Sequence, residues 1–383
     1  MSFWGFLRPD GSVGTRNHVG VISTVTCAND IVQWISDQVP GCVHFTHQQG
    51  CGQSKPDMEI VHRTLIGLGC NPNLAAVLLV SLGCEGNVDH ILEGIAASGK
   101  PVDKVMIQAL GGAGAAFSEG SRLARQMVTE ASKMNPQEVD DLHLMVGVKC
   151  GASDTTSGLA ANPSVGAACD ELIKRGGSVI FGETPEMMGA EHILAKRAAT
   201  PEIGKQIIEI VDRMERRALN MGVDMRGANP SRGNIAAGLT TIEEKSLGAI
   251  VKGGTTPIMG VCEQGERPQG KGLFVLDSPG QEPKAVTALA ASGAQIIVFA
   301  TGIGAPQGFP FVPVIKVTAN PHTYQHLPDH MDIHIDIGSE DGLQDLGGVI
   351  LDEVLEVASG KKTKAEALNY GNFPDIWVPG TTF

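Results

Sequence analysis

Three cysteines, Cys51, Cys84 and Cys150, each follow an apolar, strand-like run, and each has a glycine within one or two positions. Open α/β sheets gather their functional loops at the carboxyl ends of the strands, so thiols in these positions can meet at one place. Three thiolates together would suit iron, an iron–sulfur cluster with one open coordination position, or zinc. The competing interpretation is that each cysteine is a small buried hydrophobic residue, as most free cysteines are.

Two side chains beside these cysteines have groups that could transfer protons. His47 lies in a polar loop shortly before Cys51, and an imidazole, whose unperturbed pKa is near ~6.5, can bind a metal or carry a proton. Glu85 directly follows Cys84 and would present a carboxylate beside the thiol. The alternatives are an ordinary loop histidine and a solvated carboxylate.

The segment GVKCGASDTTSGLAANP, residues 147–163, is dense in small polar side chains between a predicted strand and a predicted helix. Such side chains, with the N–H groups at a helix start, can bind a carboxylate or hydroxyl groups. Helix capping would account for one or two of them, but not for the whole set. We therefore expect a substrate-binding loop whose binding residues are Ser153, Asp154, Thr155, Thr156 and Asn162.

A second polar cluster, GETPEMMGAEH at residues 182–192, follows the next predicted strand. Its side chains could serve as acid–base groups or oxygen ligands, although acidic residues also favour helix N-termini for electrostatic reasons. Glu183, Glu186 and His192 are the candidates for proton transfer. Dinucleotide binding is disfavoured, because neither LGGAGAAFSEG nor ATGIGAPQG has the GxGxxG spacing at a strand-to-helix turn.

The elements that must position these groups alternate between strand and helix, which favours mainly parallel sheets flanked by helices. We expect an α/β fold with two Rossmann-like domains, because 383 residues exceed what one core usually serves. The polar segment 129–141 is the best candidate boundary, giving domains 1–136 and 137–383. Predicted strands cover 19–25, 75–82, 142–148 and 178–183, and predicted helices cover 28–38, 57–68, 88–98, 162–175, 202–219 and 241–251.

Composition excludes several classes of protein. A formal charge of −13 with no Lys/Arg cluster argues against nucleic-acid binding. No apolar stretch reaches the ~18 residues of a membrane span, and the N-terminus lacks a signal-peptide pattern. We therefore expect a cytoplasmic protein, without membrane contact, whose eight cysteines are reduced.

Six segments, in order, resemble the large catalytic region of the altronate/galactarate dehydratase family: GFLRPDGSVGTRNHV, THQQGCG, LGCE, GVKCGASDTTSGLAANP, GETPEMMGAEH and GLTTIEEKSLGAIVKGGT. In that family a small domain often precedes this region in the same chain, and sulfolactate sulfo-lyase, which is similar, is built from two subunits. The resemblance implies a separate large subunit whose residues 1–136 correspond to the family's second domain. Its partner would be a small subunit carrying the missing domain. The family's usual CGGSD, followed by glycine and an aromatic residue, is CGASDTTSG here, which leaves the substrate open.

The resemblance implies a lyase that needs divalent iron or a similar metal. The expected reaction is dehydration of an aldonic or aldaric acid to a 2-keto-3-deoxy acid, and the alternative is release of sulfite and pyruvate from sulfolactate. We expect iron, as Fe²⁺ or a labile 4Fe–4S cluster, on Cys51, Cys84 and Cys150, with His47 and Glu85 beside it. The alternatives are a mononuclear Fe²⁺ or Mn²⁺ site of histidines and carboxylates, and a non-catalytic iron sensor. The large subunit is expected to form a homo-oligomer.

Overall fold

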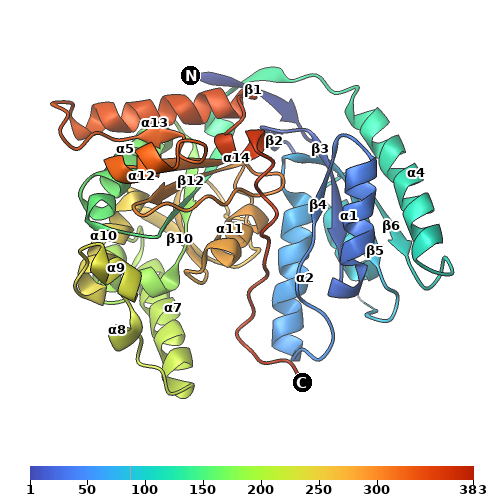
Figure 1. Ribbon diagram of the computed structural model, residues 1–383, viewed down its shortest axis with the longest axis horizontal. Coiled ribbons are helices and arrows are strands. Elements are labelled where there is room, and N and C mark those ends of the chain that lie inside the picture. The colour runs from blue at the N-terminus through green and yellow to red at the C-terminus, as the bar shows by residue number, and fades with distance from the viewer. Residues whose placement is uncertain (87) are drawn as a thin grey trace.

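The computed structural model describes residues 1–86 and 88–383, and it contains three sheets with helices on their faces (Figure 1). The predicted α/β class with parallel sheets flanked by helices is confirmed. The description of the two halves as Rossmann-like domains stays a prediction. Within the described residues, no helix is long and apolar enough to cross a membrane.

The N-terminal half is built on a four-stranded parallel sheet of order β4-β3-β5-β6. Its strand β5 is buried along its whole length, since the run LAAVLLVS offers apolar or small side chains to both faces. Helices α1 and α4 pack on one face, and α2 and α3 pack on the other. The elements are β3 (His18–Ser23), α1 (Asn29–Gln38), β4 (Cys42–Phe45), α2 (Lys55–Cys70), β5 (Leu74–Ser81), α3 (Val88–Ala96), β6 (Val102–Met106) and α4 (Ala113–Ala131).

The C-terminal half is built on a seven-stranded parallel sheet of order β10-β11-β9-β8-β12-β13-β14. Helices α5 and α13 pack together over one part of it. The strands are β8 (Met145–Gly151), β9 (Ser178–Phe181), β10 (Ile258–Glu263), β11 (Gly272–Asp277), β12 (Ile296–Thr301), β13 (Val314–Thr318) and β14 (Ile333–His334). The helices are α5 (Asn162–Lys174), α6 (Glu191–Lys196), α7 (Pro201–Asn220), α8 (Met225–Ala228), α9 (Arg232–Ala236), α10 (Ile242–Ile250), α11 (Glu282–Ala291), α12 (Pro321–His326), α13 (Leu343–Ala358) and α14 (Lys364–Ala367).

A small antiparallel sheet joins the chain's beginning to the start of the C-terminal half. Strand β1 (Ser2–Leu7) pairs with β2 (Val13–Gly14) on one side and with β7 (Gln137–Asp140) on the other. The polar segment 129–141, predicted as a boundary, therefore contains the end of α4 and the whole of β7. The first residues of the chain lie against the half that follows residue 136.

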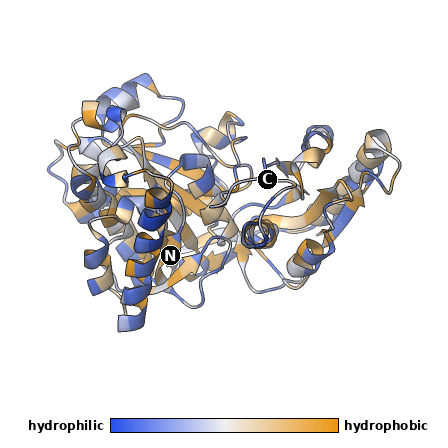
Figure 2. Ribbon diagram, turned by 90° about the horizontal axis from the view of Figure 1, so that it is seen from below, coloured by the Kyte–Doolittle hydropathy of each residue, from blue (hydrophilic) through white to orange (hydrophobic). Residues whose placement is uncertain are grey.

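The two halves are separate lobes in Figure 2, and α2 and α11 pack against each other where they meet. A Cβ atom on Gly67 of α2 would lie 2.2 Å from the carbonyl oxygen of Ala291, so only glycine allows this close approach. Asn71 Nδ2 donates to the carbonyls of Ala290 and Ala294 at 2.8 and 2.9 Å. One hydrophobic core continues across the contact and includes residues of both large sheets.

Candidate functional site

A polar cavity of about 250 Å³ lies where β8 ends in the C-terminal half. This position, outside the carboxyl end of a central parallel strand, is where open α/β sheets bind their ligands. Its size suits a small molecule. We call it the lysine cavity, and it is lined by Cys150, Gly151, Ala152, Ser153, Glu186, Ser231, Asn234, Lys245, Gly280 and Glu282.

Buried charges support the floor of the lysine cavity. Glu183 receives Lys149 Nζ on Oε1 at 2.8 Å and Lys252 Nζ on Oε2 at 2.8 Å, and these three side chains are almost fully shielded from solvent. Lys252 Nζ also lies 3.2 Å from Cys150 Sγ. Glu183 (φ 72°) and Ala152 (φ 48°) both adopt left-handed backbone conformations, which are costly for residues other than glycine. Such outliers concentrate at functional sites.

Burial and ion pairing shift the pKa values of this cluster in opposite directions. Burial raises the pKa of Glu183, but the ammonium groups of Lys149 and Lys252 outweigh it and hold that pKa below its usual value. Burial lowers the pKa of Lys252, but the nearby Cys150 and Glu183 raise it above its usual value. For Cys150, burial raises the thiol pKa more than Lys252 lowers it. The cluster is therefore a buried Lys–Glu–Lys triad of two ion pairs beside a thiol whose pKa is raised.

A second ion pair lines the lysine cavity and is only partly shielded. Lys245 Nζ lies 3.1 Å from Glu186 Oε1 and 2.8 Å from Asn229 Oδ1, with 11% and 14% of the Lys245 and Glu186 side chains exposed. The other oxygen, Glu186 Oε2, is buried and has no hydrogen-bond partner. A buried acceptor without a partner is costly, so this atom is a strong candidate to receive a proton.

The predicted substrate loop only partly lines the lysine cavity. Ser153 lines it, and its carbonyl accepts Nδ2 of Asn234 at 2.8 Å. Asp154 organises the loop instead, since its carboxylate accepts the Thr156 hydroxyl at 2.7 Å and the Ser157 N–H at 3.0 Å. Thr155 is exposed and is not among the lining residues.

Asn162 and His192 also fall outside the lysine cavity. Asn162 is buried at the start of α5, where Nδ2 donates to the carbonyl of Gly248 at 2.7 Å. His192 is exposed on α6. Of the three residues predicted for proton transfer, only Glu186 lines the cavity. Glu183 is buried next to it and pairs with Lys149 and Lys252, and His192 takes no part in either arrangement.

Cys51 and Cys84 line a different cavity, of about 220 Å³, in the N-terminal half. Both cysteines are exposed, and each belongs to the loop that follows a strand of the four-stranded sheet. We call this the thiol cavity, and it is lined by Thr24, Val25, Gln49, Gly50, Cys51, Gly52, Gln53, Met58, Val61, His62, Cys84 and Glu85.

His47 and Glu85 hold the loops of the thiol cavity in place. His47 is buried, its Nε2 lies 2.9 Å from the Ser23 carbonyl, and its Nδ1 accepts the Gln49 N–H at 3.1 Å. Burial lowers the pKa of His47 to about 4, so the ring is neutral at pH 7 and engaged on both sides. Glu85 accepts hydrogen bonds from the Ser81 and Thr24 hydroxyls at 2.6 and 2.8 Å.

Two backbone N–H groups, of Leu82 and Gly83, also donate to Glu85, at 3.2 and 2.8 Å. Burial raises the pKa of this carboxyl, but its hydrogen bonds, beginning with that from Ser81, lower it below its ordinary value. Both side chains therefore have the geometry of loop-positioning residues, and both ring nitrogens of His47 are engaged.

The predicted iron ligands fit the structure only in part. Cys51 and Cys84 share a cavity and supply soft ligands, whereas Cys150 lines the other cavity, beside the Lys252 ammonium, which opposes binding of a second cation there. In the described part of the chain, no three or more His, Cys, Asp or Glu side chains are placed to hold a metal ion.

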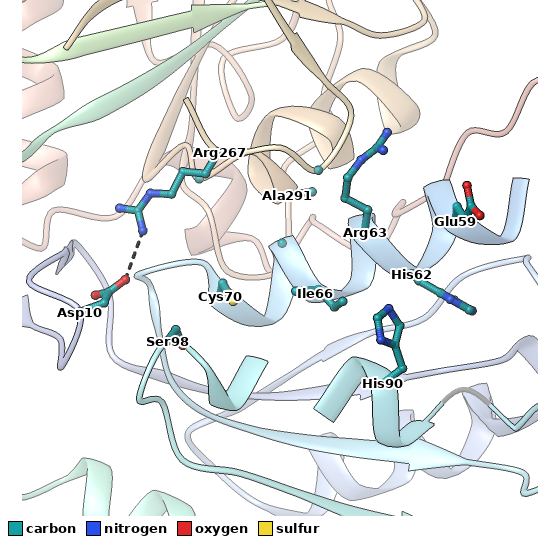
Figure 3. Close-up of a pocket in the computed structure, with 13 residues that line it drawn as sticks. Asp10, Glu59, His62, Arg63, Ile66, Cys70, His90, Ser98, Arg267 and Ala291 are labelled. Carbon is teal, nitrogen blue, oxygen red and sulfur yellow. Dashed lines mark hydrogen bonds and ion pairs between the residues drawn. The ribbon is translucent and has the colours of Figure 1, made fainter. Parts of the chain in front are cut away.

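A larger cavity, of about 540 Å³, runs along α2 at the junction of the two halves (Figure 3). The Asp10–Arg267 ion pair, at 3.2 Å, closes one end, near Cys70 and Ser98. Cys70 is the last residue of α2, and Ser98 follows the end of α3. In alternating α/β folds the helices end at the edge of the sheet opposite the carboxyl ends of the strands. The lysine cavity, at a carboxyl edge, is the better candidate active site.

The sequence did not point to Lys149 or Lys252 as site residues, and it favoured a solvated surface position for Lys245. A signal was present for Lys149, because a lysine inside the apolar run LMVGVKCG must be buried and must find an anion. Lys252 stands in a short apolar run before two glycines, and nothing local distinguishes it from a lysine near a helix end.

An α/β protein with a polar cavity, a buried Lys–Glu–Lys triad and a carboxylate ready to take a proton has the features of an enzyme for small polar molecules. Comparison of the sequence identifies the family. Residues 142–381 match the D-galactarate/altronate dehydratase C-terminal domain, and residues 5–132 match the second domain of D-galactarate dehydratase/altronate hydrolase. The chain belongs to this family, which confirms the expected kinship.

Individual relatives cover nearly the whole chain. It is 38% identical to the (2R)-sulfolactate sulfo-lyase subunit beta of Chromohalobacter salexigens, over 97% of this chain and 96% of that protein. It is 34% identical to an altronate dehydratase of Bacillus subtilis, over 95% of this chain and 75% of that protein. It is 33% identical to a galactarate dehydratase of Escherichia coli, over 94% of this chain and 73% of that protein.

Proposed function

We propose that this protein is a lyase that removes the C2 proton of a small 2-hydroxy acid and expels the group on C3. The observation that carries the proposal is Glu186 Oε2, a buried carboxylate oxygen with no hydrogen-bond partner, in a polar cavity beside Lys245. The names of the relatives support the class of reaction, since all three are dehydratases or a sulfo-lyase.

The first step is proton abstraction. Glu186 Oε2 takes the C2 proton, which is weakly acidic because it lies next to an ionised carboxylate. Ser153, Ser231 and Asn234 are the polar lining groups that would orient the substrate's hydroxyls and carboxylate. Negative charge then develops on the substrate as an enediolate, and the positive charge of Lys245 at the cavity wall stabilises it.

The second step is departure of the C3 group. In a dehydration, the Lys245 ammonium donates a proton to the C3 hydroxyl, the C3–O bond breaks, and water leaves with the formation of an enol. The proton on Glu186 can then pass to Lys245, since the two groups are 3.1 Å apart, and the pair is restored. The enol takes up a proton at C3 and loses one from its oxygen, which gives the 2-keto-3-deoxy acid.

Release of sulfite from sulfolactate is the second candidate reaction. It uses the same first step, after which the C3–S bond breaks, sulfite leaves as a stable anion, and the enol becomes pyruvate. The 38% identity with the sulfo-lyase subunit supports this candidate, as the 34% identity with an altronate dehydratase supports dehydration.

We also propose iron as the cofactor and a small subunit as the partner. Cys51 and Cys84 are exposed thiols on one cavity and are suitable soft ligands. When bound there, iron would supply Lewis-acid chemistry to an oxygen ligand in the thiol cavity, which is separate from the lysine cavity. The partner is supported by the word "subunit" in the name of the sulfo-lyase relative.

The test is an anaerobic assay of the chain, together with its small subunit, against altronate, galactarate and sulfolactate. Formation of a 2-keto-3-deoxy acid, or of sulfite with pyruvate, supports the proposal and chooses between its two reactions. Absence of turnover of all three, in protein that contains iron, would contradict it and would favour the iron-sensor alternative.

A further inference from the structure

The three exposed cysteines of the chain follow three neighbouring strands of one sheet. Cys27 comes after β3, Cys51 after β4 and Cys84 after β5, and these strands are adjacent in the order β4-β3-β5. The other five cysteines are buried or only partly exposed. Because the strands are parallel, all three exposed thiols belong to loops at the same edge of the sheet.

Hydrogen bonds tie these loops to each other. The N–H of Thr26, next to Cys27, donates to the Gln49 carbonyl at 2.8 Å, and Asn29 Nδ2 donates to the His47 carbonyl at 2.8 Å. The Thr24 hydroxyl donates to Glu85, the residue after Cys84, at 2.8 Å. The central loop therefore contacts both of its neighbours, and the positions of the three loops are fixed together.

The thiol cavity lies among these loops. Cys51 and Cys84 line it, and Thr24 and Val25 line it from the loop that carries Cys27. Two polar side chains of these loops already have partners, because Glu85 accepts four hydrogen bonds and His47 is engaged through both ring nitrogens.

A cluster fits this arrangement better than a single ion. In a single-ion site all ligand atoms converge on one point, and the described side chains form no such group of three. In an iron–sulfur cluster each thiolate binds its own iron atom, so the sulfur atoms lie further apart. Three thiolates on a 4Fe–4S cluster would leave one iron without a cysteine ligand.

We propose that Cys27, Cys51 and Cys84, and not Cys150, bind one 4Fe–4S cluster at the carboxyl edge of the four-stranded sheet. Cys27 replaces Cys150 in the ligand set expected from the sequence, because Cys150 is buried beside the Lys252 ammonium in the other cavity. The iron without a cysteine ligand is open to an oxygen ligand. That last point rests on the proposed function, whereas the cluster itself does not.

The experiment measures iron, acid-labile sulfide and visible absorption after anaerobic reconstitution with ferrous iron and sulfide. The wild type is compared with Cys27→Ser, Cys51→Ser and Cys84→Ser. The controls are Cys150→Ser and Cys70→Ser, the latter a partly exposed cysteine at the far end of α2. Each of the three ligand variants is expected to lose at least about half of the iron and sulfide, and the controls are expected to keep both.

Alkylation of free thiols provides a second measurement that does not depend on the variants. In reconstituted wild-type protein, Cys27, Cys51 and Cys84 are expected to be protected, and removal of iron with a chelator should expose them. The proposal is overturned if Cys27→Ser keeps the full cluster while Cys150→Ser loses it, or if Cys27 is alkylated at the same rate with and without iron. Lyase turnover is assayed separately, so either result leaves the test of the proposed function intact.

Discussion

The ammonium group of Lys252 lies 2.8 Å from Oε2 of Glu183, and only 2% of each side chain reaches solvent. Lys149 binds the other oxygen of the same carboxylate, so one buried anion is matched by two buried cations. Removing the Glu183 carboxylate is therefore expected to lower the free energy of unfolding more than removing either lysine ammonium group. The triad is the structural support on which the lysine cavity depends.

Glu183→Gln should destabilise the protein by roughly 3–5 kcal/mol at pH 7, because it leaves two buried ammonium groups without a counter-ion. Lys252→Met should cost less, since Lys149 and Glu183 remain paired. Chemical denaturation of both variants at pH 7 measures the difference. Equal losses, or a larger loss for Lys252→Met, would contradict this account of the triad.

Glu186→Gln should lower kcat by about 10²-fold or more, the usual contribution of a positioned acid–base group, while leaving the unfolding transition close to that of the wild type. The matched control is Glu209→Gln on the exposed face of α7, where the carboxylate pairs only with Lys205. Steady-state assays with the accepted hydroxy acid give the comparison. A Glu186→Gln variant with wild-type kcat would exclude it as the base.

Lys245→Met should distinguish the two candidate reactions. Expulsion of hydroxide needs a proton from the Lys245 ammonium, whereas sulfite leaves as a stable anion. If the substrate is a sugar acid, kcat should fall by about 10²-fold. If the substrate is sulfolactate, the fall should be clearly smaller. A wild-type rate of dehydration by this variant would show that another group protonates the leaving hydroxyl.

Acidification should destabilise the protein through His47. Its pKa is about 4 in the folded protein and near ~6.5 when unfolded, so between these values the unfolded chain binds more protons and stability falls as the pH falls. The contribution is full above pH ~6.5, and about 2 kcal/mol of it is lost between pH 7 and pH 5. Denaturation of wild type and His47→Gln over this range should show a flatter dependence in the variant. Parallel curves would contradict the assignment.

The C-terminal segment should stabilise the loop that carries Cys51. The carbonyl of the fully buried Ile376 accepts hydrogen bonds from Gln48 and Gln49 at 2.7 and 2.6 Å, and the Phe383 N–H donates to the Gly52 carbonyl at 2.9 Å. Ile376→Ala is expected to cost about 2–4 kcal/mol, against about 1 kcal/mol for Ile376→Val. Faster proteolysis near residues 48–52 in Ile376→Ala only would support the link. Unchanged proteolysis in both variants would argue against it.

Local patterns predicted the elements well, because burial on both faces and helix capping leave signals in consecutive residues. Helix α7 illustrates this point: the sequence predicts a helix over 202–219, and the structure has one at Pro201–Asn220, where the Thr200 hydroxyl accepts the Ile203 N–H. Strand β7 was missed since its exposed sequence QEVD is stabilised by pairing with β1, more than a hundred residues earlier in the chain.

The site was only partly predictable. The sequence placed Cys51, Cys84 and Glu186 at strand ends, and the structure puts each of them on a cavity. The order of the strands in space decides which strand ends share a cavity, and the sequence does not give that order. For this reason the sequence pattern grouped Cys150 with two cysteines of another sheet and did not include Cys27. Pairings such as Lys252 with Glu183 join residues far apart in the sequence, and no local signal reveals them.

The central claim, removal of a C2 proton, is tested most directly by a single-turnover measurement on the chain with its small subunit. The accepted hydroxy acid is supplied with either hydrogen or deuterium at C2, and the rate of product formation is compared. We predict clearly slower turnover of the deuterated substrate, with the deuterium released to solvent. Equal rates, or deuterium transferred to C3 of the product, would contradict it.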